Sequence, residues 1–213
     1  LEVIGAEAQH DNMQSAAYRV IWGFLRKCPA SKVRFCIFDP KEGGGSVRML
    51  SNFVNKMPDS YKRAVTQMSR TEELLSCLKE LEGQTLDFIR DRPDYDDLLD
   101  YNAHNPRRTE AITLLMLYDF PLNADARCLE LLSSVMQKGN RCGIYVVLCR
   151  NTAVEVASSY DPIDEKLAEL EKNCVQIECK ENGFALLPYH LSVRLIEKPD
   201  AGQLKKFAVE YHK

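Results

Sequence analysis

Hydrophobic and polar positions along this chain alternate between short, strongly apolar runs and longer amphipathic stretches. The short runs have the length of strands, and their nearly continuous apolar character predicts strands buried on both faces of a parallel sheet. The longer stretches repeat their apolar residues with the helical period. We therefore expect strands at 1–5, 33–38, 111–118 and 143–149, and helices near 12–27, 123–138 and 163–172.

Residues 61–103 form a polar insertion between the second and third of these strands. Leucines recur in it at helical spacing, which predicts a helix-rich segment with breaks at Gly83 and Pro93. The acidic run from Asp94 to Asp100 lacks the glycine and the terminal glutamate of a calcium loop. We interpret it as a solvated helix start.

The last third of the chain is less regular. Strands are expected at 174–179 and 184–187, joined through residues 181–183, because the Asn-Gly pair there favours a tight hairpin turn. A final helix is expected near 201–211. The alternation of strands and helices predicts an α/β fold, with a central, mostly parallel sheet covered by helices on both faces.

Length and composition are those of one domain over residues 1–213. The 28 Lys and Arg against 31 Asp and Glu give a formal charge of −3, so no basic field attracts nucleic acid. The apolar runs are well below the roughly 18 consecutive residues of a membrane span, and residues 1–10 lack the pattern of a signal peptide. We expect a cytoplasmic domain and, because the sequence starts inside a strand-like run, a piece excised from a longer protein.

Eight cysteines in a chain of this size favour a reduced cytosolic protein over a disulfide scaffold. Cys36, Cys142 and Cys149 lie in or beside apolar strand patterns and are expected to be small core residues. Cys174 and Cys179 have no histidine at a zinc-site spacing, and a closed zinc site needs four ligands, so no metal site is expected. The four histidines are scattered and indicate no catalytic constellation.

The segment VIGAEAQHDN, residues 3–12, has the strand, turn and helix order of a phosphate-binding loop. A working loop reads G-x-x-x-x-G-K-[ST]. Counted from Gly5, the second glycine falls on His10, the lysine on Asp11 and the hydroxyl residue on Asn12. The lysine supplies positive charge to the β and γ phosphates, so a carboxylate at Asp11 replaces attraction with repulsion. This segment is not expected to bind ATP in the usual way.

The apolar run AITLLMLYDF, residues 111–120, predicts a buried strand. In a nucleotide site such a strand presents an Asp for magnesium and then a Glu that polarises water. Here those places are Tyr118 and Asp119, so the metal-holding acid is missing and the second acid is one methylene shorter. Asp119 is either a relic of that acid or the cap of a helix starting around Asn123, and we favour capping and turn formation.

Two further segments complete a resemblance to a known family. FCIFDPKEGGG, residues 35–45, resembles the strand-end "DPK-G-G" signature of FtsK/SpoIIIE-type ATPases of the HerA/FtsK superfamily. MQKGNRCGIYVVLCRN, residues 136–151, resembles their "GRxxGIHLILATQRP" stretch. Asn140 stands where the family has an arginine, although Arg141 is adjacent, and Arg150 stands where it has the sensing glutamine. The four segments follow the family order along most of the chain.

This resemblance implies a RecA-like P-loop NTPase domain with degenerate Walker motifs, as in DNA translocases and type VII secretion coupling ATPases. The positions that it assigns to the nucleotide site are Gly5, His10, Asp11, Asn12, Tyr118, Asp119 and Arg150. Lys41, Asn140 and Arg141 are candidate contacts to a phosphate or to a neighbouring subunit, although a solvated side chain is the default for Lys41. No catalytic residue, metal ligand or cofactor is expected, and ATP and Mg²⁺ would bind only if the site were functional after all.

The leading hypothesis is a structural or regulatory module of a DNA- or protein-translocating motor. Motors of this family string several such domains in one chain and assemble as rings, so the resemblance implies neighbouring ATPase domains or subunits as partners, and membrane tethering through other parts of the protein. One alternative is an active ATP-binding DNA translocase domain. The other is a nucleotide-free module that binds a secretion substrate or a partner protein, and whether the chain is an enzyme stays open.

Direct DNA binding by this domain is expected to be weak. Its longest clusters of basic residues are Arg107-Arg108 and Lys205-Lys206, and non-specific binding depends on several phosphate contacts at once.

Overall fold

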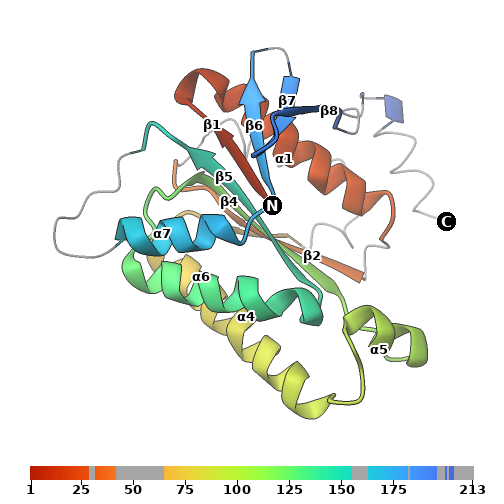
Figure 1. Ribbon diagram of the computed structural model, residues 1–213. Helices are drawn as coiled ribbons and strands as arrows, with labels where there is room; N and C mark the ends of the chain where they lie inside the picture. Colours follow the sequence, from red (N-terminus) through yellow and green to blue (C-terminus); the bar gives the residue numbers. More distant parts are fainter. Residues whose placement is uncertain are drawn as a thin grey trace.

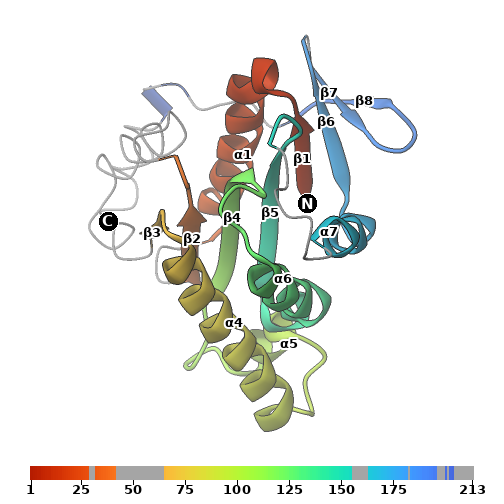
Figure 2. The same ribbon diagram turned by 90° about the vertical axis from the view of Figure 1, so that its left-hand side faces the viewer.

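The computed structural model describes residues 1–28, 32–41, 65–154, 163–181, 183–195, 200 and 202–203. In these residues a sheet of eight strands has the order β3-β2-β4-β5-β1-β6-β7-β8. The strands are β1 (Glu2–Gly5), β2 (Val33–Phe38), β3 (Val65–Met68), β4 (Ile112–Phe120), β5 (Ile144–Asn151), β6 (Gln176–Lys180), β7 (Gly183–Leu186) and β8 (Leu191–Val193). Neighbouring strands from β3 to β6 pair in parallel, and β7 and β8 add antiparallel strands at the other edge (Figure 2).

Helices cover both faces of this sheet (Figure 1). α1 lies on one face, whereas α4, α6 and α7 lie on the other, so the predicted α/β architecture is confirmed. The helical elements are η1 (Glu7–Gln9), α1 (His10–Leu25), α4 (Thr71–Asp91), α5 (Leu98–His104), α6 (Ala126–Lys138), η3 (Gly139–Cys142) and α7 (Ile163–Lys172).

The central strand β4 supplies side chains to two separate cores. Leu114 and Met116 pack on the α1 side, and Leu115 and Leu117 pack on the side of α4, α6 and α7. Successive side chains of a strand point to opposite faces, so a strand covered on both faces needs an uninterrupted apolar run. This is the reason that the apolar runs of the sequence located β2, β4 and β5 correctly.

The polar insertion differs most from expectation. It contains β3, an edge strand that was not predicted, because two of its four residues are exposed and polar. Gly83 does not break the helix: α4 runs through it, and the burial of Leu74, Leu78 and Leu81 outweighs the roughly 1 kcal/mol that a helical glycine costs. The helix does end at Asp91, ahead of the predicted break at Pro93.

Several other boundaries moved by a few residues. α1 begins at His10 instead of residue 12, and β4 and β5 extend to Phe120 and Asn151. The hairpin of β6 and β7 is confirmed, and so is the helix start in the acidic run, where the Asp97 side chain accepts a hydrogen bond from the Asp100 amide at the start of α5. The strand β8 was not predicted.

The predicted core cysteines, Cys36, Cys142 and Cys149, are all buried. Residues 43–45 and most of the predicted final helix at 201–211 lie outside the described residues. Within the described ranges, no helix combines the length and the apolar character that crossing a membrane requires.

Candidate functional site

The carboxyl ends of β1, β2, β4 and β5 meet at one end of the sheet. In open α/β sheets, ligands bind in the crevice outside these ends. Gly5 ends β1 in register with Asn151 of β5, Asp39 follows β2, and Asp119 is next to last in β4. All four residues are buried. Three of them, Asp39, Asp119 and Asn151, bring polar side chains to the end of the sheet where this class of fold binds its ligands.

The turn between β1 and α1 is closed by its own hydrogen bonds. The Ala6 amide donates to Oε1 of Gln9 at 2.9 Å, and the Gln9 amide donates to the Ala6 carbonyl at 2.9 Å. A phosphate-binding turn instead points backbone N–H groups at its ligand. Gly5 has a packing role here, because a Cβ on it would lie 3.0 Å from Cγ of Met13.

Asp119 is the centre of a cluster of polar side chains, the Asp119 cluster, whose other members are Lys41, Asn151 and His10. Lys41 Nζ lies 3.1 Å from Oδ1 of Asp119, Asn151 Nδ2 donates to the same oxygen at 3.0 Å, and His10 Nε2 lies 3.5 Å from Oδ2. The Asp119 side chain is 1% exposed, against 25% for His10 and 39% for Lys41. A buried carboxylate needs such a charged partner and hydrogen bonds, and this one has both.

The backbone after β2 holds Lys41 in this position. The Asp39 amide donates to the Met68 carbonyl at 2.9 Å, which continues the pairing of β2 with β3. The Lys41 amide then donates to Oδ1 of Asp39 at 3.1 Å, so a short turn follows the strand. The edge strand β3 thus helps to place the lysine that contacts Asp119.

Asp11 and Asn12 are not part of the Asp119 cluster. Asp11 is exposed in the first turn of α1. Asn12 Nδ2 donates to the Lys180 carbonyl at 3.0 Å, which ties the start of α1 to the end of β6. Of the three altered loop residues, the structure brings only His10 to the site.

Solved structures share this architecture. ATPases 2 and 3 of EssC from Geobacillus thermodenitrificans match with a TM-score of 0.61 and 12% identity, over 99% of this chain and 42% of that one. The pCW3 conjugation coupling protein TcpA with ATPγS matches with a TM-score of 0.66 and 11% identity, over 99% and 64%. ATPases 2 and 3 of Thermomonospora curvata EccC in complex with a signal sequence peptide match with a TM-score of 0.59 and 13% identity, over 99% and 41%.

The fold is that of the FtsK/SpoIIIE-type P-loop ATPase domains. The chain spans less than two thirds of each of these neighbours, and at such identities the likeness is one of fold. No protein-family profile and no curated protein matches the sequence.

In this FtsK-type fold, Tyr118 does not face the site. It is buried in the core beneath α1, where burial raises the pKa of its hydroxyl well above the usual range and the nearby Cys149 and Asp39 raise it further. The register of β4 against β5 shifts between Leu117 and Phe120, and Asp119 has a φ of 49°. This local irregularity lets Asp119 reach the polar cluster while the tyrosine stays in the core.

Asp119 forms a turn, as expected, since the Leu122 amide donates to its carbonyl at 2.9 Å. The favoured capping role is wrong. α6 begins at Ala126, and its first turn is capped by Asp125, whose side chain accepts from the Cys128 amide at 2.7 Å. Asp125 is the residue immediately before the helix, and its side chain satisfies a free amide there.

Arg150, which the sequence resemblance places at the family's sensing glutamine, is directed away from Asp119. Its Nε lies 3.1 Å from Oε1 of Glu171 in α7, and its Nη1 donates to the Asn151 carbonyl at 3.3 Å. Neighbouring side chains of a strand point to opposite faces, and the adjacent Asn151 is the one that reaches Asp119. The structure therefore separates Arg150 from the cluster.

Asn140 and Arg141 precede β5 and lie at the opposite end of the sheet from Asn151, and both are exposed. The Arg141 guanidinium donates to the carbonyls of Asp96 and Tyr95 at 2.8 and 3.0 Å, so it fastens the loop between α4 and α5. Neither residue is close enough to the Asp119 cluster to share a ligand with it.

Asn151 and Asp39 were not among the predicted site residues, although both lie in the segments that carry the family resemblance. A usable signal existed: each stands at or just after the carboxyl end of a predicted parallel strand, where polar side chains gather. Asn151 was missed because β5 runs two residues beyond the predicted strand.

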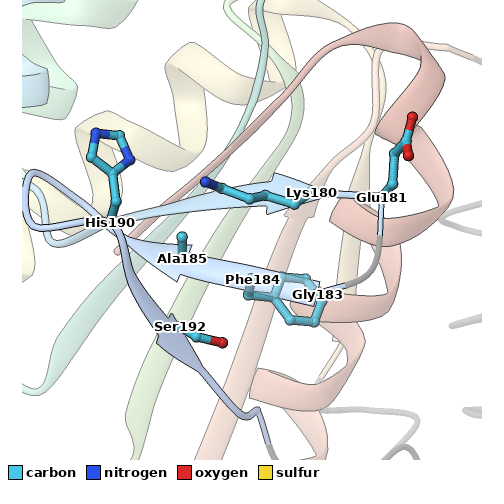
Figure 3. A pocket seen from close by; sticks show the side chains of 7 residues that line it. All are labelled: Lys180, Glu181, Gly183, Phe184, Ala185, His190 and Ser192. Carbon is cyan, nitrogen blue, oxygen red and sulfur yellow. The ribbon is translucent and has the colours of Figure 1, made fainter.

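A hollow of about 500 Å³ lies away from this cluster, at the sheet edge. Figure 3 shows that its lining side chains come from β6, β7, β8 and the turns between them. They include Lys180, whose carbonyl binds Asn12, and His190, whose Nδ1 lies 3.6 Å from Oε2 of Glu178.

Proposed function

We propose that this domain is a catalytically degenerate FtsK/SpoIIIE-type domain that serves as a structural or regulatory module of a DNA- or protein-translocating motor. The observation that carries the proposal is the contact between Lys41 and the buried Asp119. In a working site the two acids at this strand end hold a magnesium ion and polarise the attacking water, and Asp119 stands at the second of these positions. Here an internal ammonium group, with the His10 ring beside it, lies against that carboxylate.

The loop supports the same proposal. The Ala6 amide is bonded to the Gln9 side chain, and Asp11 stands where the lysine of a working loop would contact phosphate. A nucleotide would therefore meet a closed turn and a like charge at once.

The test is calorimetric titration of the protein with magnesium-ATP, together with a turnover assay. We expect no measurable hydrolysis and a dissociation constant weaker than about 1 mM, a loss of several kcal/mol relative to a micromolar site. Micromolar binding that is abolished by Asp119→Asn would overturn the proposal and favour the active translocase.

A gain-of-binding variant makes the test sharper. The variant combines His10→Gly, Asp11→Lys, Asn12→Ser and Lys41→Ala, which together restore the loop residues and remove the ammonium group from Asp119. It leaves Tyr118 in place, because a carboxylate in the core beneath α1 would be buried without a partner. We expect measurable magnesium-ATP binding, which the matched control with an added Asp119→Asn should lose.

A nucleotide-free binding module is the second candidate. The observation in its favour is that a neighbour in fold, EccC from Thermomonospora curvata, has been solved in complex with a signal sequence peptide. Binding of a secretion-signal peptide in the absence of ATP, measured by fluorescence anisotropy, would favour this function. Binding of an adjoining ATPase domain alone would favour the structural or regulatory module.

A further inference from the structure

A pair of cysteine thiols lies between β2 and α4, away from the Asp119 cluster. Cys36 is in β2 and belongs to the core beneath α4, and Cys77 of α4 packs against that core. The two thiols are close enough to interact with each other. Both also line a hollow of about 320 Å³, so small molecules can reach the pair.

The hollow lies beside the short edge strand β3. Thr66 of β3 is the register partner of Cys36, and Thr66 is exposed. Cys36 itself is 2% exposed, whereas Cys77 is half-buried.

The surroundings of the pair favour the thiolate form of Cys36. The hydrogen bond from Cys77 lowers the pKa of Cys36, against the effect of burial, and Arg34 lowers it further. The pKa of Cys77 is raised by the same hydrogen bond and by burial. The ion pair of Arg34 with Glu80, 3.1 Å between Nη2 and Oε1, holds the guanidinium beside the hollow. A thiolate is the nucleophilic form of cysteine.

The other six cysteines have different surroundings. Cys142 and Cys174 donate to backbone carbonyls, and Cys128, Cys149 and Cys179 are buried. Burial raises the pKa of each of the six, namely Cys28, Cys128, Cys142, Cys149, Cys174 and Cys179. A lowered pKa is found in Cys36 alone among the eight, all of which lie in the described part of the chain.

We propose that Cys36 and Cys77 form a peroxide-reactive dithiol that oxidises to an intramolecular disulfide joining β2 to α4. The Cys36 thiolate attacks one oxygen of hydrogen peroxide, an S–O bond forms, the O–O bond breaks, and hydroxide leaves. The Cys77 sulfur then attacks the Cys36 sulfur, the S–S bond forms, the S–O bond breaks, and the oxygen leaves as water with the Cys77 proton. The two thiols lose two electrons and the peroxide gains them.

The disulfide would join α4 to β2, the strand that leads into the turn containing Lys41. Lys41 contacts Asp119, so formation of the disulfide would affect the position of a side chain that belongs to the polar cluster.

The experiment treats the reduced full chain with near-stoichiometric hydrogen peroxide, blocks the remaining thiols with N-ethylmaleimide and maps peptides without reduction. We expect a Cys36–Cys77 cross-link that forms at least about tenfold faster than Cys28 is modified, since reactivity follows thiolate content and access. In Cys77→Ser, dimedone should trap a sulfenic acid on Cys36. The matched control, Cys174→Ser, changes another half-buried thiol and should leave the cross-link unchanged.

The proposal would be overturned if N-ethylmaleimide alkylated both Cys36 and Cys77 while another cysteine oxidised first. It would also be overturned if the cross-links mapped to other pairs of cysteines. The wild-type peptide map decides this even if Cys77→Ser fails to fold.

Discussion

Glu2 and Asp119 are both buried carboxylates, but only one of them has a charge in direct contact. Asp119 has Lys41 against it, whereas Glu2 accepts one hydrogen bond, from Nε2 of Gln176 at 2.9 Å. The other oxygen of Glu2 finds no hydrogen-bond partner among the described residues. Burial raises the pKa of Glu2 above its usual 4.5, and the Gln176 hydrogen bond offsets this in part.

Glu2→Gln is therefore expected to stabilise the domain at neutral pH. A raised pKa in the folded state means that the folded protein binds the proton more tightly, so wild-type stability falls as pH rises from about 4.5 through the folded pKa. The gain at pH 7 should be on the order of 1 kcal/mol and should vanish toward pH 4. Urea unfolding across this pH range measures it, with Glu169→Gln on the exposed face of α7 as control. A constant difference at all pH values would show that ionisation of the buried Glu2 is not its cause.

At the scale of the elements, two glycines that look alike in the sequence have opposite roles. Gly143 joins η3 to β5 with a φ of 71°, and a Cβ on it would overlap Cδ2 of Leu98 in α5. Gly83 lies within α4, and a Cβ there would meet no atom within 4 Å. The first is required by a turn and a close helix contact, and the second is tolerated.

Alanine at these two positions should have opposite effects. Gly143→Ala is expected to destabilise the domain by about 2 kcal/mol or more, from left-handed backbone strain and overpacking against Leu98. Gly83→Ala is expected to stabilise it by about 0.5–1 kcal/mol, because alanine favours the helix. Thermal unfolding of the two variants gives the comparison, and a shift of the same sign in both would refute it.

For the whole molecule, the formal charge of −3 governs contact with nucleic acid. We expect duplex DNA to bind no more tightly than about 10⁻⁴ M at physiological salt, the weak end of non-specific affinity. Fluorescence anisotropy with a labelled duplex at several salt concentrations tests this. Sub-micromolar binding with a steep salt dependence would reveal a basic patch formed by folding and would move DNA translocation ahead of partner binding.

The sequence predicted the α/β architecture and most elements, because buried parallel strands such as β2 and β4 leave continuous apolar runs. It did not reveal β3 or β8, which are short edge strands with exposed residues. The site was predicted only in part. Counting along a motif placed Gly5 and His10 near the strand ends, but the contact of Lys41 with Asp119 depends on a turn and a strand irregularity that leave no periodic signal.

The place of β1 in the strand order has a kinetic consequence. Val3 pairs with Cys149 on one edge and with Ile177 on the other, so the first strand of the sequence lies between two of the later ones. Contacts between residues far apart in a chain close slowly, because the entropy of a long loop is lost before they form. During synthesis, β1 leaves the ribosome before β5 and β6, and it has both neighbours only after β6 has emerged. Until then the backbone of β1 is unpaired and can form hydrogen bonds with strands other than β5 and β6.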